Sequence, residues 1–294
     1  MSMKPDFNKG LLLTSLGSFW WGFIGVIYFE YVSFIGHVEL VVHRCLWTAI
    51  MLIFTTTLFS KWKLFLITSS NKSYLFYLFI SGFLIFINWA VWIYAVATDR
   101  IIDASFGYFI MPIISVLLGY LFFKENLNKK RTFSILLVLI SITILIFFNL
   151  KDLPWVGLVV ALSWAFYNLI RKKINVDTDI GLLIESLYIL PFAIITFYFI
   201  RKNGFNDFSF SNIELSLLLI LAGPMTVIPL FLYVRGVELI GLGPTGMIFY
   251  ITPTLQFILG YFYYNEEFSL VKFLSFAIIW IAVIIYLKDL YENN

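Results

Sequence analysis

Charged residues are scarce in this chain. Only 13% of its 294 residues are Asp, Glu, Lys or Arg, whereas 61% are hydrophobic and 20% are aromatic. A soluble domain carries about 25% charged and about 45–50% apolar residues, and it exposes few large apolar patches. One globular core of this size cannot bury so large an excess of apolar side chains. The composition therefore excludes an ordinary soluble domain and predicts a protein that crosses a membrane several times.

Three further absences narrow the class of protein. Cys45 is the single cysteine, so no intrachain disulfide can form. No GxxxxGK[ST] phosphate-binding loop occurs, which argues against transport driven by ATP. Lys4 and Lys9 precede an apolar run, as in a signal peptide, but the run continues from Leu11 to about Tyr31 with no Ala-x-Ala cleavage site. We therefore expect this run to be an uncleaved first span.

Apolar runs of about 20 residues recur along the whole chain, and each is long enough to cross a bilayer as a helix. We expect an all-α integral membrane protein with about ten transmembrane helices. Short loops make consecutive spans antiparallel, and we expect the longer loops at Lys61–Ser73 and Arg201–Asn212 to be plain polar linkers. The predicted spans cover residues 10–29, 38–59, 74–97, 101–121, 132–150, 154–170, 180–200, 213–234, 242–262 and 269–287.

One segment of the sequence occurs twice. Asp103–Glu125 reads DASFGYFIMPIISVLLGYLFFKE, and Leu242–Glu266 reads LGPTGMIFYITPTLQFILGYFYYNE. When Pro112 is aligned with Pro253, no gap is needed, and a Gly-Tyr pair and a closing glutamate coincide. We therefore expect two related halves of about five spans each, which cover residues 1–150 and 151–294.

Lys and Arg residues in the loops indicate the orientation of the chain. If the N-terminus is cytoplasmic, most of them fall on the cytoplasmic side, so both termini are predicted inside. Because each half has an odd number of spans, the second half crosses the membrane in the opposite sense. Inverted repeats are typical of secondary transporters, although a duplication can also serve only to build a stable bundle. The opposite side holds only Arg100, Lys151, Arg201, Lys202 and Lys272.

The second span carries the richest set of polar side chains. Glu39, His43 and Trp47 are spaced four residues apart and form one helical stripe, with Arg44 beside it. A charge at bilayer depth usually faces a cavity or a partner. Arg44 either binds an anionic group of a solute or closes an outer gate, or it forms an ion pair with Glu39 or Glu30 that fixes helix packing. His43 either couples protons or makes a packing hydrogen bond.

Glu185 in the seventh span is related to Arg44 by the same offset that relates the two prolines. Inverted symmetry places Glu185 near the cytoplasmic face and Arg44 near the outer face. In a hydrocarbon core about 30 Å thick, this puts the two side chains more than about 10 Å apart in depth. We therefore expect Arg44 and Glu185, with Glu39 and His43, to be gating or coupling groups rather than one ion pair.

Other polar and aromatic side chains within the spans are candidates for a central cavity. Asn88 needs a partner because lipid offers none, and that partner is either another helix or the solute. Proline removes a backbone donor and kinks a helix, so we expect kinks at Pro112, Pro224, Pro229 and Pro253, with the eighth span broken near mid-membrane. The predicted cavity residues are Trp20, Asn88, Trp89, Tyr108, Met111, Trp164, Tyr167, Thr226, Tyr250 and Gln256.

Several segments resemble the RarD family, in the EamA branch of the drug/metabolite transporter superfamily. The similarity extends over nearly the whole chain, in the expected order. In the family an asparagine usually precedes the proline of the SxGYFxxP motif, whereas this chain has Met111, so its selectivity can differ. The matching segments are VELVVHRCLWT, INWAVWIYAV, SFGYFIMP, ALSWAFYNLIRK, AGPMTVIPL and YITPTLQF.

The resemblance implies a permease with about ten helices around a central cavity, in a bacterial inner membrane. We expect it to move a small organic metabolite or drug-like solute, such as an amino acid, without ATP. The expected partners are that solute and the lipid bilayer, with no cofactor, metal or nucleic acid. Coupling to protons or a counter-solute stays open, as does the choice between monomer and homodimer.

Two other functions remain as alternatives. An intramembrane enzyme could use His43 as a base, but the sequence offers no obvious set of nucleophile, base and orienting group. A membrane receptor or scaffold would bind without transport, but little chain is left for a signalling domain. We therefore expect no enzymatic activity.

Overall fold

The structure is a computed structural model, which describes all residues except 1–2, 98–100, 150–154, 210, 264–269 and 294. Every regular element among the described residues is a helix, as expected where backbone groups must be satisfied without water. The helices are α1 (Met3–Phe19), η1 (Trp20–Ile24), α2 (Gly25–Tyr31), α3 (His37–Leu58), α4 (Trp62–Ser69), α5 (Lys72–Ala97), α6 (Ile101–Phe123), α7 (Lys129–Asn149), α8 (Trp155–Lys173), α9 (Thr178–Lys202), α10 (Ile213–Ile240), α11 (Leu242–Ile248), α12 (Ile251–Phe262) and α13 (Leu270–Asn293).

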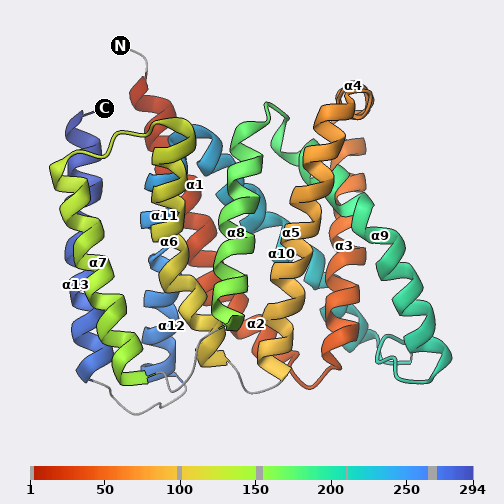
Figure 1. The fold of residues 1–294 in the computed structure, drawn as a ribbon. Coiled ribbons are helices and arrows are strands. Elements are labelled where there is room, and N and C mark those ends of the chain that lie inside the picture. The colour runs from red at the N-terminus through yellow and green to blue at the C-terminus, as the bar shows by residue number, and fades with distance from the viewer. Residues whose placement is uncertain (1–2, 98–100, 150–154, 210, 264–269, 294) are drawn as a thin grey trace.

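The long helices lie side by side in one bundle, and both ends of the chain emerge at its upper face in Figure 1. We call this the terminal face; it also carries residues 59–71, 124–128 and 174–177. The opposite face, which carries residues 32–36 and the segment between α9 and α10, is called the distal face.

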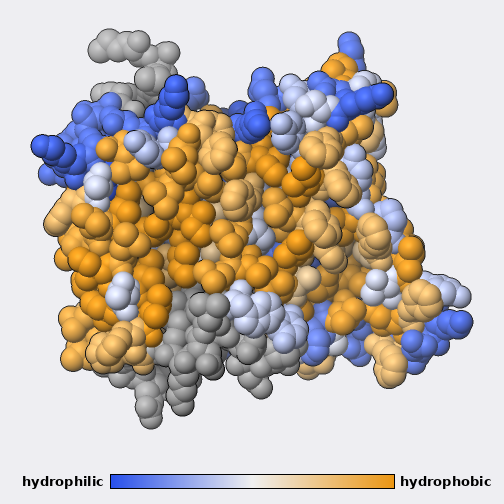
Figure 2. Space-filling view, in the orientation of Figure 1, coloured by the Kyte–Doolittle hydropathy of each residue, from blue (hydrophilic) through white to orange (hydrophobic). Residues whose placement is uncertain are grey.

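Large apolar side chains cover much of the outside of the bundle. Phe54, Phe147, Phe192 and Phe262 are exposed by 64%, 81%, 68% and 76%. In Figure 2 hydrophobic residues form a broad belt, and hydrophilic residues gather along the upper edge and at the lower right. Such a belt is incompatible with water and matches lipid. The chain is therefore an all-helical, multi-pass membrane protein, as its composition predicts.

Among the described residues, seven helices are long and apolar enough to cross a membrane, and Gly107–Phe123 in α6 forms a shorter apolar helix. The remaining predicted spans coincide with α8 and with α11 plus α12. The seven candidate spans are Asp6–Tyr31, His37–Leu58, Lys72–Ala95, Lys129–Phe148, Thr178–Lys202, Ile213–Ile240 and Leu270–Asn293.

The helix breaks differ from those that the prolines predict. α10 continues through Pro224 and Pro229, so the predicted break of the eighth span is wrong, and α6 continues through Pro112. The ninth span is divided between α11 and α12, just before Pro253. A helix can keep running past a proline when only one backbone hydrogen bond is lost and neighbouring helices hold the segment.

Two features of the first third of the chain were not expected. The first span contains the π-helical turn η1, which joins α1 to α2 without interruption. The loop Lys61–Ser73, predicted as a plain linker, instead contains the short helix α4. Lys61 precedes α4, and its amino group donates to Asp177 and Asp179 at 3.2 and 2.9 Å, which ties this loop to the start of α9.

Helices from the two parts of the chain pack against each other throughout the bundle. The main pairs are α1 with α10, α5 with α8, α3 with α10, α5 with α9, α6 with α8, α3 with α9, α6 with α11, and α7 with α13. Two of these contacts depend on glycine. A Cβ atom at Gly223 would lie 2.6 Å from the carbonyl oxygen of Trp47, and one at Gly82 would lie 3.1 Å from that of Glu185. Small residues let helix backbones approach closely in lipid.

Candidate functional site

A cavity of about 80 Å³ lies between helices from both parts of the chain. Phe29, Trp92 and Gly107, near the distal ends of α2, α5 and α6, lie on its wall, so it belongs to the distal half of the bundle. Pockets for small organic ligands usually measure about 300–1,000 Å³, so this one must widen to admit a solute. Its lining residues are Trp21, Gly25, Val26, Phe29, Arg44, Asn88, Trp89, Trp92, Gly107, Tyr108, Met111, Val160, Trp164, Phe249, Thr252 and Gln256.

Arg44 contributes the charge of this cavity. Its side chain is buried, with 6% of the residue exposed. Its Nε donates a 2.9 Å hydrogen bond to Thr226 Oγ1, which in turn donates to the Ala222 carbonyl. The guanidinium carbon lies 4.6 Å from the ring centre of Trp89 and 5.0 Å from that of Phe29. The ion pair of Arg44 with Glu39 or Glu30, which was one alternative for this residue, is absent from the described contacts, and so is a pair with Glu185.

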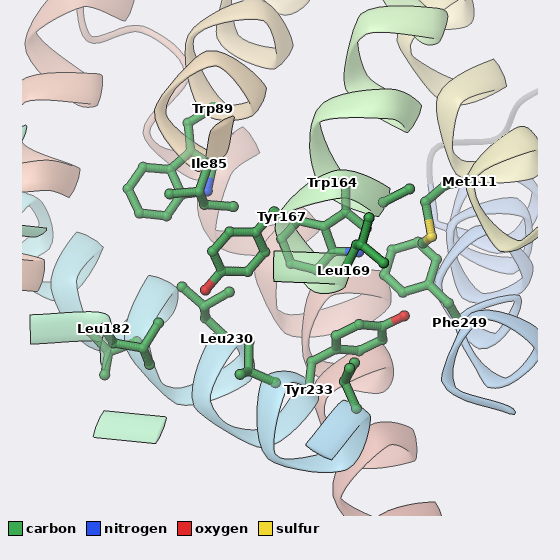
Figure 3. Close-up of a cluster of buried hydrophobic side chains, with 14 of the residues drawn as sticks. Ile85, Trp89, Met111, Trp164, Tyr167, Leu169, Leu182, Leu230, Tyr233 and Phe249 are labelled. Atoms are coloured by element: carbon green, nitrogen blue, oxygen red, sulfur yellow. The ribbon is translucent and has the colours of Figure 1, made fainter. Parts of the chain in front are cut away.

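Aromatic rings form most of the remaining wall. Trp21 meets Trp164 edge to face, with 5.1 Å between ring centres. Phe249 lies 5.8 Å from Tyr108 and 6.4 Å from Trp164. Figure 3 shows Trp164 between Tyr167 and Phe249, with Met111 beyond it. Rings held by one another at these distances form a rigid apolar surface.

Polar groups on this wall are few. Asn88 Nδ2 donates to the Val160 carbonyl and to Ser163 Oγ at 2.9 and 3.1 Å, so the interhelical hydrogen bond that was one alternative for Asn88 is present. Trp164 Nε1 is buried, and the Trp164 ring lies 5.5 Å from that of Tyr233. Gln256 also reaches the cavity, on α12. The wall therefore combines one cation with a small number of amide and indole groups.

A layer of buried charge lies on the terminal side of the cavity. Glu185 Oε1 accepts a 2.6 Å hydrogen bond from Ser81, and its Oε2 accepts one from Tyr167 at 3.2 Å. Arg171 Nη1 lies 3.5 Å from Glu185, and Arg171 Nη2 lies 3.9 Å from Glu238. The Arg171 side chain, which the sequence places among the loop cations, has no exposed surface. This layer of buried side chains therefore separates the cavity from the terminal face.

Glu125 joins α6 to α11 at the terminal face. Its two carboxylate oxygens each accept a 2.8 Å hydrogen bond, from the backbone N–H of Leu242 and of Gly243. These are among the first N–H groups of α11, which have no acceptor inside the helix. Burial raises the pKa of the Glu125 carboxyl, although these two donors oppose the rise. The repeat-related Glu266 lies outside the described residues.

Several predicted site residues lie away from the cavity. Thr226 reaches it only through its bond to Arg44, and Tyr167 through its ring contact with Trp164. The Tyr250 hydroxyl donates to the Phe109 carbonyl, and Trp20 packs in a separate cluster near the distal face. These four residues therefore do not line the described cavity. The structure brings together Asn88, Trp89, Tyr108, Met111, Trp164 and Gln256.

Glu39 and His43 contact each other near the distal face, and Glu39 binds the segment that precedes α10. Glu39 accepts hydrogen bonds from the backbone N–H of Asp207 at 2.9 Å and of Phe208 at 3.1 Å. His43 Nε2 lies 3.4 Å from Glu39, and Trp47 donates to His43 Nδ1 at 3.1 Å. The helical stripe predicted from the sequence is therefore a chain of contacts that fixes the segment before α10.

The sequence missed several wall residues that carry no polar signal. Trp21, Phe29, Trp92 and Phe249 are four of many aromatic residues, and nothing in their spacing separates them from those that face lipid. The need for glycine at position 107 is clearer, since a Cβ there would lie 2.7 Å from the Gly157 carbonyl oxygen. Gly107, five residues before Pro112, could have been noticed in the sequence as a position for a close helix contact.

The model of the EamA-like transporter family matches residues 8–147 and again residues 154–288. The chain belongs to this family. A transporter of Vibrio cholerae, named only as an uncharacterized transporter, is 33% identical over 98% of this chain and 96% of its own length. Protein RarD of Escherichia coli K12 is 31% identical over 96% of this chain and 95% of its own length. The resemblance to the RarD family is thereby confirmed.

A solved crystal structure is also similar in fold. It superposes with a TM-score of 0.71 and covers 94% of this chain and 96% of its own, at 13% sequence identity. At that identity the likeness concerns the fold alone. Within the family, the relatives named as transporters include YojE of Bacillus subtilis, which is 31% identical over 95% of this chain and 93% of its own length.

Proposed function

We propose that this protein is a secondary transporter that moves a small organic solute across the bacterial inner membrane by alternating access, without ATP and without converting the solute. The observation that carries the proposal is the cavity, whose wall combines residues of both parts of the chain, from Trp21 to Gln256. Between it and the terminal face lie buried aromatic and charged side chains, including Tyr167, Glu185 and Arg171. A cavity that is closed toward one face is expected in one state of an alternating-access cycle.

The pattern of helix contacts supports two inverted halves, 1–150 and 151–294. Under the repeat, α1, α3 and α5 correspond to α8, α9 and α10. The pair α1 with α10 then maps onto α8 with α5, and α3 with α10 maps onto α9 with α5. The pairs α3 with α9, α6 with α11, and α7 with α13 map onto themselves. The two matches of one family model, to residues 8–147 and 154–288, agree with this division.

Individual contacts repeat in the same way. Arg44 and Glu185 hold equivalent positions, and each is hydrogen-bonded to a hydroxyl on the equivalent helix, Thr226 on α10 or Ser81 on α5. Gly223 and Gly82 are also equivalent, and each brings its helix close to the backbone of α3 or α9. We propose that these repeated contacts hold the two gates, with Arg44 on the outer side and Glu185 on the cytoplasmic side.

In this proposal the termini are cytoplasmic, as the Lys and Arg distribution predicts. The described conformation is then closed toward the cytoplasm, and solute enters the cavity from the outer side. The wall groups Asn88, Tyr108, Met111 and Gln256 contact the solute. Coupling to a proton or a counter-solute would act through Glu185, whose carboxylate is held by Tyr167, or through His43.

Solute flux into proteoliposomes tests the proposal. We expect a panel of labelled organic solutes to include at least one that equilibrates faster with the protein than with protein-free vesicles. The double variant Arg44→Ala with Glu185→Ala should reduce that flux at least tenfold. Arg201→Gln removes one cation from an exposed helix end and serves as the control that keeps flux. Tight binding with no flux for any solute, or conversion of a solute into a product, would overturn the proposal.

A further inference from the structure

Arg44 is a buried cation for which the described part of the structure records no carboxylate partner within 4.0 Å. Its nearest acid along α3 is Glu39, whose oxygens already accept hydrogen bonds from the backbone of Asp207 and Phe208. A buried charge is expensive unless it is paired, so a site of this kind calls for an anion. Thr226 satisfies Nε alone, and no hydrogen bond is recorded for Nη1 or Nη2.

The guanidinium is held in one orientation by its surroundings. Trp89 and Phe29 lie against the guanidinium carbon at 4.6 and 5.0 Å, and Thr226 Oγ1 holds Nε at 2.9 Å. A fixed guanidinium plane offers its remaining N–H groups as a fork, which matches the two oxygens of a carboxylate. Because Arg44 lies on the cavity wall, a ligand in the cavity can reach that fork.

The rest of the wall selects against more strongly charged ligands. No Asp, Glu or Lys occurs among the described residues that line the cavity, and Arg44 is the one cation there. A phosphate dianion would call for more donors than one arginine, and an ammonium group would find no carboxylate. The aromatic faces of Trp21, Trp164 and Phe249 instead favour a planar apolar body.

We propose that the cavity binds an organic monocarboxylate with a planar, apolar body, and that the carboxylate pairs with Arg44. This inference rests on the proposed transport function only in taking the cavity as the solute-binding site. Binding itself can be measured without flux. Gln256 adds a polar contact for substituents on the ring.

The first experiment uses the unmodified protein, in detergent or nanodiscs, with benzoate as the probe. Binding is measured by calorimetry or by quenching of tryptophan fluorescence. We expect benzoate to bind at least tenfold more tightly than benzamide, its neutral isostere, which corresponds to about 1.4 kcal/mol. Three further probes should each bind more weakly than benzoate. Acetate lacks the planar body, phenyl phosphate carries more than a single charge, and phenylalanine adds an ammonium group. Equal binding of benzoate and benzamide would overturn the inference.

The second experiment changes the cation. Arg44→Gln should lower the affinity for benzoate at least tenfold and leave that for benzamide unchanged, whereas Arg44→Lys should lose less because it keeps the charge. Arg201→Gln is the control with the same change of charge at an exposed position. If Arg44→Gln does not fold, Thr226→Val releases the guanidinium and should weaken benzoate binding alone. If Arg44→Gln and Thr226→Val bind benzoate as tightly as the unmodified protein does, the role of Arg44 is refuted.

Flux measurements separate this inference from the proposed transport function. If benzoate binds with the expected pattern but neither benzoate nor any other solute is transported, the inference stands and the transporter proposal falls. If solutes other than carboxylates are transported through a protein that does not distinguish benzoate from benzamide, the transporter proposal stands and this inference falls.

Discussion

At the scale of single residues, the buried charges depend on neighbours that the sequence does not reveal. Arg171 follows the apolar part of α8 and looks like a loop cation, yet its side chain is fully buried beside Glu185. Gly181 leaves room for the guanidinium in this position, because a Cβ there would overlap Arg171 Nη1. The local pattern of a basic helix end is thus overridden by two partners that come from α9 and α10, Glu185 and Glu238.

Removal of Glu185 should destabilise the protein more than removal of the whole ion pair. Glu185→Ala leaves Arg171 buried with Glu238 at 3.9 Å as its remaining carboxylate, and a loss of about 3 kcal/mol in the free energy of unfolding is expected. Glu185→Gln keeps hydrogen bonds to Ser81 and Tyr167 and should lose less. The double variant Arg171→Met with Glu185→Ala should recover part of the loss, as measured by denaturant unfolding in detergent. If the double variant is as unstable as Glu185→Ala, the unpaired arginine is not the cause.

At the scale of helices, the ninth span differs most from a simple rod. Gly241, with φ 93°, turns the chain after α10, and α11 begins with its first N–H groups on Glu125. α11 ends at Ile248, and α12 starts after Phe249 and Tyr250. The glutamate that follows α6 therefore holds the start of the short helix α11 at the terminal face.

Glu125→Ala should loosen the terminal face. It leaves the N–H groups of Leu242 and Gly243 without an acceptor, and an unsatisfied buried donor costs about 1–3 kcal/mol. We expect a lower melting temperature and faster hydrogen exchange that is confined to the start of α11. Lys124→Ala changes the neighbouring exposed residue and serves as the control. Unchanged exchange at Leu242 and Gly243 in Glu125→Ala would show that the carboxylate does not hold this helix.

The sequence predicts the spans well because each one is a long apolar run, and lipid leaves the backbone no alternative to a helix. It predicts the breaks poorly. Proline is a visible signal, but α10 continues through Pro224 and Pro229, whereas α11 ends at Ile248, five residues before Pro253. Wall residues such as Trp21 and Phe29 were missed for a related reason. Where both the core and the lipid are apolar, periodicity does not tell the two faces of a helix apart.

At the scale of the whole molecule, the proposed orientation follows from charge and from the parity of the spans. Both termini lie at one face, which fits an even number of crossings. Lys61, Lys124 and Lys130 lie in segments at this terminal face, whereas the segment around Ser33 at the distal face has no Lys or Arg. Cytoplasmic segments are enriched in these residues, so the terminal face is proposed to be cytoplasmic.

Labelling of introduced cysteines tests this orientation directly. Cys45→Ser gives a cysteine-free background, since Cys45 is the single cysteine of the chain. Ser70→Cys reports on the terminal face, and Ser33→Cys and Asn203→Cys report on the distal face; all three positions are exposed. In intact cells a membrane-impermeant maleimide should label the two distal cysteines and leave the one at position 70 unlabelled until the membrane is permeabilised. The reverse pattern would invert the proposed topology and assign the closed face to the outside. Labelling of positions 33 and 203 from opposite sides would rule out the arrangement of helices itself.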